Sequence, residues 1–224
     1  MIDKPFKDYK MKTRIITILL FLFITFPMAA QKGGKEVSHY IFPEFTTGTI
    51  KFKTGQVKVV SLNYNSVTEE MIFDSNGKHL AIADPMSIDT ITILGRQFIP
   101  YQNIFYEVVE VLPVPLLIHH AATLIPPGRP AGYGSTSETS SITENSSIIS
   151  SGKVYDMNLP ADYRVNPETE FMIKTDKLYK IYNVNQVVKY FPEKNAAIKE
   201  FVKKNKTNFK KIEDMKQLIE FCNK

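Results

Sequence analysis

The sequence is poor in the residues that build disulfide and metal scaffolds. It has 224 residues but only one cysteine, Cys222, and no tryptophan. One cysteine excludes an internal disulfide and a cysteine-rich zinc module. The glycine content, 10 residues, excludes a collagen. A chain that is 43% hydrophobic and 23% charged is not disordered throughout, so we expect one folded domain of ordinary size.

Long hydrophobic runs are also missing. The longest near the N-terminus, Ile15–Phe26, falls short of the roughly 20 residues that span a bilayer. Because it follows Arg14 and precedes the small residues of Met28–Ala30, it predicts a signal peptide over residues 1–30, cleaved near Ala30-Gln31. The absence of a cysteine after the run excludes a lipoprotein anchor. An uncleaved anchor stays open, as does the choice of Met1 or Met11 as the start.

The charge is divided unevenly along the chain. Residues 1–30 carry +3, residues 31–173 carry −5 and residues 174–224 carry +7, which together give the net +5. The mature protein therefore combines an acidic β-rich part with a basic tail. We expect an exported protein, periplasmic or secreted, with no transmembrane span in the mature chain. Neither export nor the motif content favours nucleic acid as a partner.

Residues 31–125 predict a β-meander. Short apolar runs rich in Val, Ile, Phe, Tyr and Thr alternate with turn residues such as Thr54-Gly55 and Asn76-Gly77, which suit two-residue hairpins. Short connections favour antiparallel neighbours. The predicted strands are Ser38–Phe45, Thr49–Lys53, Gln56–Tyr64, Glu70–Phe73, His79–Ala83, Ile88–Leu94, Gln97–Tyr101, Phe105–Val111 and Val114–Ile125.

The remainder predicts a loop, two returning strands and helices. Residues 126–152 are rich in Pro, Ser, Thr and Gly and indicate a flexible loop. Lys153–Asn158 and Glu170–Lys174 are the expected returning strands. Beyond them the apolar period becomes helical, with Asn183 or Asn185 as N-cap. We predict an α+β fold: an antiparallel β-meander or half-barrel followed by two or three C-terminal amphipathic helices, packed on the same domain over residues 153–224.

Polar residues offer few catalytic patterns. His119 and His120 are adjacent on a strand and point to opposite faces, so we expect one ring buried and hydrogen-bonded and the other exposed. No zinc, P-loop or nucleophile-elbow motif is present, and no cofactor or metal is predicted. Glu69, Glu70, Asp74, Asp84 and Asp89 keep open an envelope hydrolase that uses paired carboxylates.

The basic tail is the candidate for partner binding. Lys199, Lys203, Lys206 and Lys210 predict a stripe that could contact an anionic envelope component or an envelope protein, although a solvated face explains the same pattern. We therefore predict a non-enzymatic periplasmic or secreted protein that binds an envelope component or a partner protein. The alternatives are the hydrolase and a carrier of an apolar ligand inside the half-barrel, lined by the side chains of Phe98, Phe105, Val108 and Val111.

Several segments resemble a known group of sequences. Ser61-Leu62-Asn63-Tyr64-Asn65 followed by Glu70-Met71-Ile72-Phe73 is similar to a pattern in an uncharacterised family of exported β-rich proteins of Bacteroidetes-type bacteria. Arg96-Gln97-Phe98-Ile99, Tyr106-Glu107 and the tail from Tyr190-Phe191-Pro192 to Leu218-Ile219-Glu220 are similar as well. The resemblance covers most of the mature chain and implies export and one β-plus-helix unit. It implies no active-site residue, because that group has no assigned function.

Overall fold

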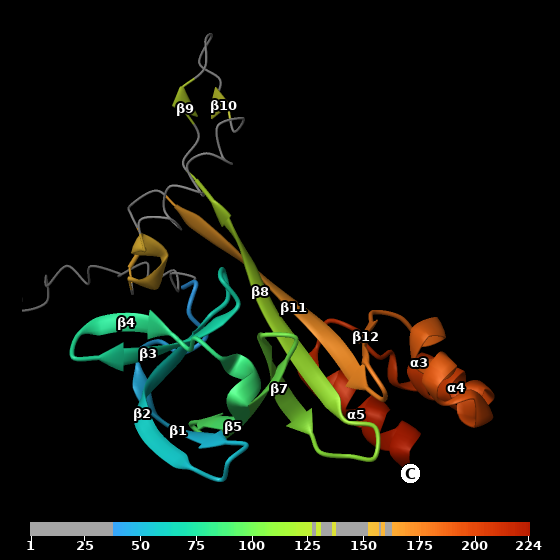
Figure 1. Cartoon of the computed structure of the whole chain (residues 1–224). Helices are drawn as coiled ribbons and strands as arrows, with labels where there is room; N and C mark the ends of the chain where they lie inside the picture. Colours follow the sequence, from blue (N-terminus) through green and yellow to red (C-terminus); the bar gives the residue numbers. More distant parts are fainter. Residues whose placement is uncertain (1–37, 127–128, 131–135, 138–151, 157, 160–162) are drawn as a thin grey trace, which may run out of the picture. The chain divides into compact units, whose positions relative to one another are not determined.

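A computed structural model describes residues 38–126, 129–130, 136–137, 152–156, 158–159 and 163–224 (Figure 1). The predicted signal peptide lies outside the described residues, as does most of the predicted loop 126–152. Two described pieces of that loop are the short strands β9 (Arg129–Pro130) and β10 (Thr136–Ser137), which pair with each other in antiparallel fashion.

The main element is an open ten-stranded sheet in which every neighbouring pair is antiparallel. Its strand order is β12-β11-β8-β7-β6-β5-β1-β2-β3-β4, and β12 and β4 form its two edges. The α+β prediction is therefore confirmed, and the sheet does not close. The strands are β1 (Thr46–Phe52), β2 (Val57–Asn65), β3 (Glu70–Ser75), β4 (Lys78–Ala81), β5 (Ile88–Ile93), β6 (Arg96–Tyr101), β7 (Ile104–Glu110), β8 (Leu116–Ile125), β11 (Arg164–Lys174) and β12 (Leu178–Ile181).

The strand order departs from a simple meander at one point. β1 to β4 follow one another as hairpins, but the chain then passes through the 3₁₀ turn η1 (Pro85–Ser87) and returns to place β5 beside β1. Thr49 therefore faces Val59 on one side and Thr92 on the other. This return joins two meanders into one sheet and curls β1–β5 (Figure 1).

Turn residues explain most of the hairpins. Asn76 and Gly77 both have positive φ, 55° and 79°, which confirms the predicted two-residue turn between β3 and β4. Leu94 and Gly95 form an equivalent turn between β5 and β6, where the sequence indicated a turn residue at Gly95. Gly55 has φ of 86°, but the loop it belongs to runs from Lys53 to Gln56, so the predicted two-residue turn at Thr54-Gly55 is wrong.

Two predicted strands are absent because side chains occupy their backbone groups. In Ser38–Phe45, only Tyr40 forms a bridge, to Asn65, while the backbone N–H and C=O of Phe42 bond to the side-chain amide of Asn63. Lys153–Tyr155 forms a 3₁₀ turn instead of a strand. Its carbonyls accept bonds from side chains far away in the sequence, such as Asn65 to Val154 at 2.8 Å.

Three helices follow the sheet: α3 (Val184–Tyr190), α4 (Asn195–Asn205) and α5 (Ile212–Asn223), with the 3₁₀ turn η4 (Pro192–Lys194) between the first two. Asn183 is the N-cap of α3, because its side chain accepts a hydrogen bond from the backbone N–H of Gln186 at 3.1 Å. The side chain of Asn223 at the end of α5 bonds to both backbone groups of Val114, just before β8. This contact fixes α5 to the sheet.

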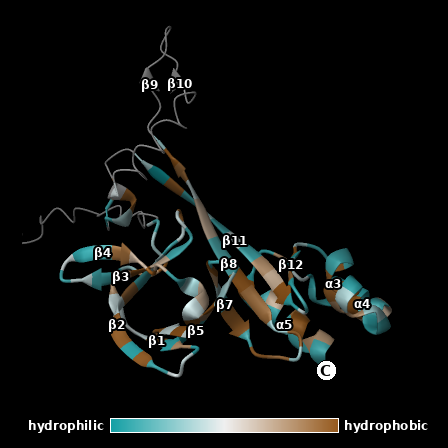
Figure 2. Ribbon diagram, viewed as in Figure 1, coloured by the Kyte–Doolittle hydropathy of each residue, from teal (hydrophilic) through white to brown (hydrophobic). Residues whose placement is uncertain are grey.

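The helices share a hydrophobic core with the sheet end made by β8, β11 and β12. In Figure 2, the part of β8 near α5 has the colour of hydrophobic residues. Cys222 is part of this core, and burial raises the pKa of its thiol to about 12, so the thiol is an inert core side chain. The members are Leu116, Ile118, Phe171, Ile173, Ile181, Val187, Phe191, Ile198, Met215, Leu218, Ile219 and Cys222.

The curled strands β1–β5 share a second core with β6 and β7. Gly48 allows β1 to pack closely against its two neighbours, since an added Cβ would lie 2.8 Å from the carbonyl oxygen of Thr92 and 2.9 Å from Leu62. The members of this core are Phe42, Ile50, Leu62, Tyr64, Met71, Ile88, Ile91, Ile93, Phe98 and Phe105.

Candidate functional site

A polar triad, made of Arg96, Glu107 and His120, lies between the two cores on the same face of the sheet. Cross-strand partners share a face, and the register pairs Ile118 of the helical core with Glu107, and Glu107 with Phe98 of the second core. Arg96 Nε donates to Glu107 Oε1 at 2.6 Å, and His120 Nε2 lies 2.6 Å from Glu107 Oε2. The triad therefore separates the helical core from the core of the curled strands.

The triad keeps Glu107 charged. Burial disfavours the carboxylate, but the hydrogen bonds and charges of Arg96 and His120 outweigh burial and lower the pKa of Glu107 to about 2. The Arg96 guanidinium also lies over the ring of Phe42, 5.0 Å from its centroid. Each member of the triad has a partner within the protein, which is typical of a structural ion pair.

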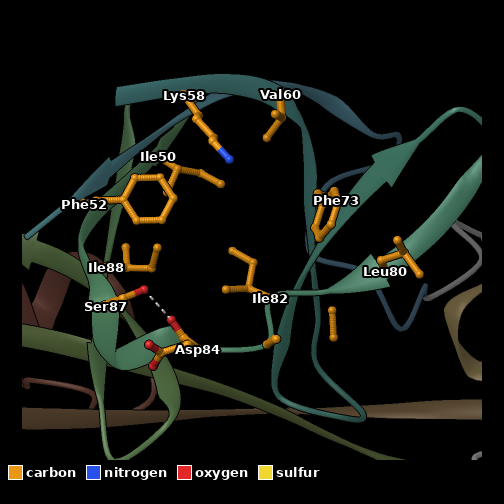
Figure 3. Close-up of a pocket in the computed structure, with 12 residues that line it drawn as sticks. Ile50, Phe52, Lys58, Val60, Phe73, Leu80, Ile82, Asp84, Ser87 and Ile88 are labelled. Atoms are coloured by element: carbon orange, nitrogen blue, oxygen red, sulfur yellow. Dashed lines mark hydrogen bonds between the residues drawn. The ribbon is translucent and has the colours of Figure 1, made fainter. Parts of the chain in front are cut away.

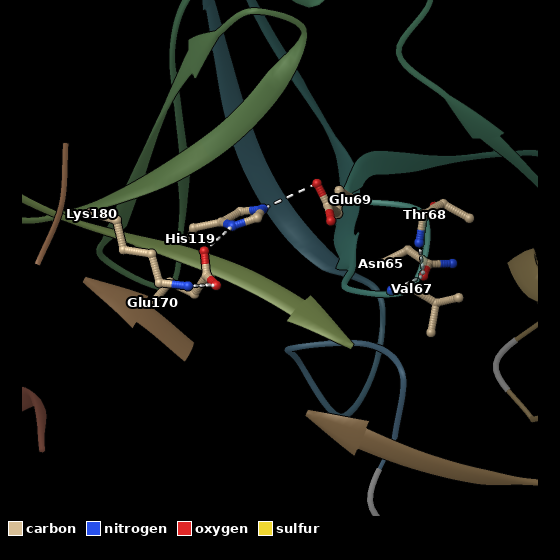
Figure 4. A network of polar contacts seen from close by, with 7 residues as sticks. All are labelled: Asn65, Val67, Thr68, Glu69, His119, Glu170 and Lys180. Atoms are coloured by element: carbon tan, nitrogen blue, oxygen red, sulfur yellow. Dashed lines mark hydrogen bonds and ion pairs between the residues drawn. The ribbon is translucent and has the colours of Figure 1, made fainter. Parts of the chain in front are cut away.

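A second network joins four segments around His119 (Figure 4). Its Nε2 lies 3.1 Å from Glu69 Oε2, and its Nδ1 lies 3.2 Å from Glu170 Oε2. Lys180 of β12 also donates to Glu170, and this hydrogen bond is the main cause of the lowered pKa of Glu170. Glu69 reaches His119 from the turn between β2 and β3, where it adopts a positive φ of 58°.

The structure corrects the expectation for the two histidines. Both side chains are only 14% exposed and both contact carboxylates, whereas one exposed ring was predicted. Sequence separation hid the reason, because Glu69 and Glu170 lie about 50 residues from His119. Within the described ranges, no three His, Cys, Asp or Glu side chains are grouped so as to hold a metal ion.

The curled strands form an apolar cavity of about 530 Å³ that is partly open to solvent (Figure 3). That volume lies within the range of roughly 300–1,000 Å³ that is usual for small-molecule sites. Ile50 and Ile88 are almost fully buried, while Leu80 is 45% exposed and faces solvent. The cavity is lined by Ile50, Phe52, Lys58, Val60, Phe73, Leu80, Ala81, Ile82, Ala83, Asp84, Ser87 and Ile88.

Only three of these lining residues are polar: Lys58, Asp84 and Ser87. Lys58 pairs with Ile50 across β1 and β2, so both side chains lie on the concave face. Its Nζ lies 5.7 Å from the centroid of the Phe52 ring. The Ser87 hydroxyl donates to the backbone carbonyl of Asp84 at 2.8 Å, which holds the loop at the edge of the cavity. The cavity thus offers a hydrophobic interior with a few charged groups.

The five acids of the predicted hydrolase do not form a joint site. Glu69 contacts His119, Glu70 accepts the Tyr155 hydroxyl at 2.7 Å, and Asp74 accepts the Gly77 backbone N–H at 2.7 Å. Asp89 pairs with Lys51 at 2.9 Å, and Asp84 lines the cavity. In the part of the chain that the structure describes, no hydrogen bond or ion pair joins two of these five acids.

The predicted carrier residues do not line the cavity. Phe98 and Phe105 are buried in the core of the curled strands, Val108 is half-buried, and Val111 is 80% exposed. The sequence signal that could have found the actual lining is the alternation along β2. There Lys58 stands in the same alternating series as Val60 and the buried Leu62.

The predicted basic stripe lies on the helical part. Lys199, Lys203, Lys206 and Lys210 are all exposed. Lys199 and Lys203 belong to α4, but Lys206 is its C-cap with φ of 51°, and Lys210 lies in the following turn. None of the four lines the cavity, so the stripe and the cavity are separate surfaces. Partner binding by the stripe stays a prediction.

The fold and site define an open antiparallel sheet with a helical end and an apolar cavity. Comparison with protein-family models, with curated proteins and with solved structures gave no match. The resemblance to exported β-rich proteins of Bacteroidetes-type bacteria therefore stays a prediction. None of the helices among the described residues is long and apolar enough to cross a membrane.

Proposed function

We propose that the protein is a non-enzymatic binding protein that holds an apolar ligand in the cavity of the curled strands. The observation that carries this proposal is the cavity itself, with its volume of about 530 Å³ and its nine apolar lining residues beside three polar ones. A hydrocarbon group that leaves water for such a site gains roughly 0.8 kcal/mol per methylene.

The proposal combines two predictions made from the sequence, binding of an envelope component and carriage of an apolar ligand. The proposal includes export to the periplasm or beyond, because an exported protein would meet apolar envelope molecules there. If residues 1–30 are a signal peptide, intact-mass measurement on the protein purified from cells that express the full sequence will give an N-terminus near Gln31. An intact Met1 or Met11 would contradict cleavage of a signal peptide.

A matched pair of variants tests the site. Val60→Phe replaces a small side chain of the cavity lining with a bulky aromatic ring. Val59→Phe makes the same change at the neighbouring position, which is 65% exposed and does not line the cavity. We expect Val60→Phe to weaken binding of a neutral fluorescent probe such as N-phenylnaphthylamine by about tenfold or more, equivalent to about 1.4 kcal/mol. Val59→Phe should bind like the original protein.

Two controls make the result decisive. Far-UV circular dichroism must show that both variants keep the fold. Native mass spectrometry of the untreated protein should reveal a co-purified apolar molecule, or binding of one that is added. If the folded original protein binds no apolar compound, or if both variants bind it equally well, the proposal is wrong.

A further inference from the structure

Lys58 is the one cation among the residues that line the cavity. Lys51 pairs with Asp89, Arg96 with Glu107 and Lys180 with Glu170. In the residues that the structure describes, Lys58 makes no ion pair, and its ammonium group contacts only the ring of Phe52. Figure 3 shows its side chain extending from β2 into the cavity. A charge beside an apolar lining gains free energy when a ligand supplies the opposite charge.

Asp84 limits how much negative charge the ligand can bring. It comes from the loop between β4 and η1 and lies on the opposite side of the cavity from Lys58 (Figure 3). Within the described residues its carboxylate accepts no hydrogen bond. A second negative charge on the ligand would be repelled there, so the two residues together favour a head group with one negative charge near Lys58.

The geometry points to a long-chain carboxylate as the ligand, with its head group paired to Lys58 and its hydrocarbon chain packed against Phe52, Ile82 and Ile88. This inference rests on the proposed function, since it names the class of the apolar ligand. It requires no group beyond the residues that line the cavity.

The head group can be tested with three compounds that share one chain. Dodecanoate, dodecanol and dodecylamine, each below its micellar concentration, are titrated calorimetrically into the full-length protein at neutral pH and low salt. We expect dodecanoate to bind about two- to fivefold more tightly than dodecanol, because it can form an ion pair with Lys58, whose side chain is exposed to solvent. Dodecylamine should bind most weakly, and added salt should narrow the difference between acid and alcohol.

A matched pair of lysine variants assigns the effect to one residue. Lys58→Gln should lower dodecanoate affinity to that of dodecanol and leave dodecanol unchanged. Lys53→Gln removes the same charge from an exposed neighbouring turn that does not line the cavity. It should change dodecanoate affinity less than twofold.

The outcomes separate the two proposals. Equal affinity of the original protein for acid and alcohol, tightest binding of the amine, or equal losses in Lys58→Gln and Lys53→Gln would overturn the carboxylate inference, while the binding function would stand. If none of the three compounds binds to the folded protein, the binding function itself fails, and the inference fails with it.

Discussion

The two ends of the sheet bury their shared face in different ways. At β8, β11 and β12, the helices α3 to α5 provide a second layer, and side chains such as Leu218 and Phe171 are almost fully buried. At β1 to β5, the curled strands bury part of the face themselves and leave a cavity of about 530 Å³. The comparison shows that packed helices fill the space over a sheet, whereas curling can leave room for a ligand.

The largest effect should come from the helical end. Leu218→Ala removes a fully buried side chain from α5, and we expect the free energy of unfolding to fall by about 2–5 kcal/mol, as for other core leucines. The corresponding change at the cavity, Ile82→Ala, should cost about 1 kcal/mol because its side chain is half-buried beside empty space. Urea unfolding followed by circular dichroism measures both.

Ile212→Ala is the control on the same helix as Leu218. Ile212 is 42% exposed, so its loss should be below about 1 kcal/mol. Equal losses for Leu218→Ala and Ile82→Ala would mean that the curled end is packed as tightly as the helical end. That result would contradict both the comparison and the cavity.

A smaller effect is expected at the boundary between the two cores. Glu107→Gln should lower the free energy of unfolding by about 2–3 kcal/mol at neutral pH, because it removes the charge that Arg96 and His120 contact. The exposed pair of Lys51 and Asp89 serves as the control. Asp89→Asn should change the free energy by at most about 0.5 kcal/mol.

The pH dependence of stability follows from the same residue. The pKa of Glu107 is about 2 in the folded protein, below its usual 4.5, so its contribution is complete above about pH 5. It is lost as the pH falls from about 5 to about 2, and amounts to about 3 kcal/mol. Urea titrations at neutral pH and near pH 3 should therefore show the gap between the original protein and Glu107→Gln shrinking in acid. A constant gap would show that the carboxylate is not held charged by its neighbours.

Local patterns predicted most strands and all the helices. Period-two alternation in Ile50–Phe52 and Met71–Phe73 identified real strands, and the turn at Asn76-Gly77 has the expected backbone. The patterns failed where side chains from distant residues took the place of strand-to-strand backbone hydrogen bonds, as Asn63 does at Phe42. They also missed β12, which pairs with β11.

The candidate site was harder to predict than the fold. The sequence directed the carrier hypothesis to Phe98 and Phe105, which fill the core. The real lining depends on β5 returning to β1, a pairing between residues about 40 positions apart such as Thr49 and Thr92. The local hydrophobic pattern does not predict that β5 pairs with β1, because loop length and tertiary packing decide which strands become neighbours.

The sequence by itself determined the α+β class, the amphipathic helices and the division of charge, because these follow from composition and from local periods of two and 3.6 residues. The tertiary structure alone decided that the helices cover only one end of the sheet, that Glu107 lies between two cores, and that Lys58 faces an apolar cavity. Those features depend on contacts between residues far apart in the chain, and such contacts cannot be predicted from the pattern of neighbouring residues.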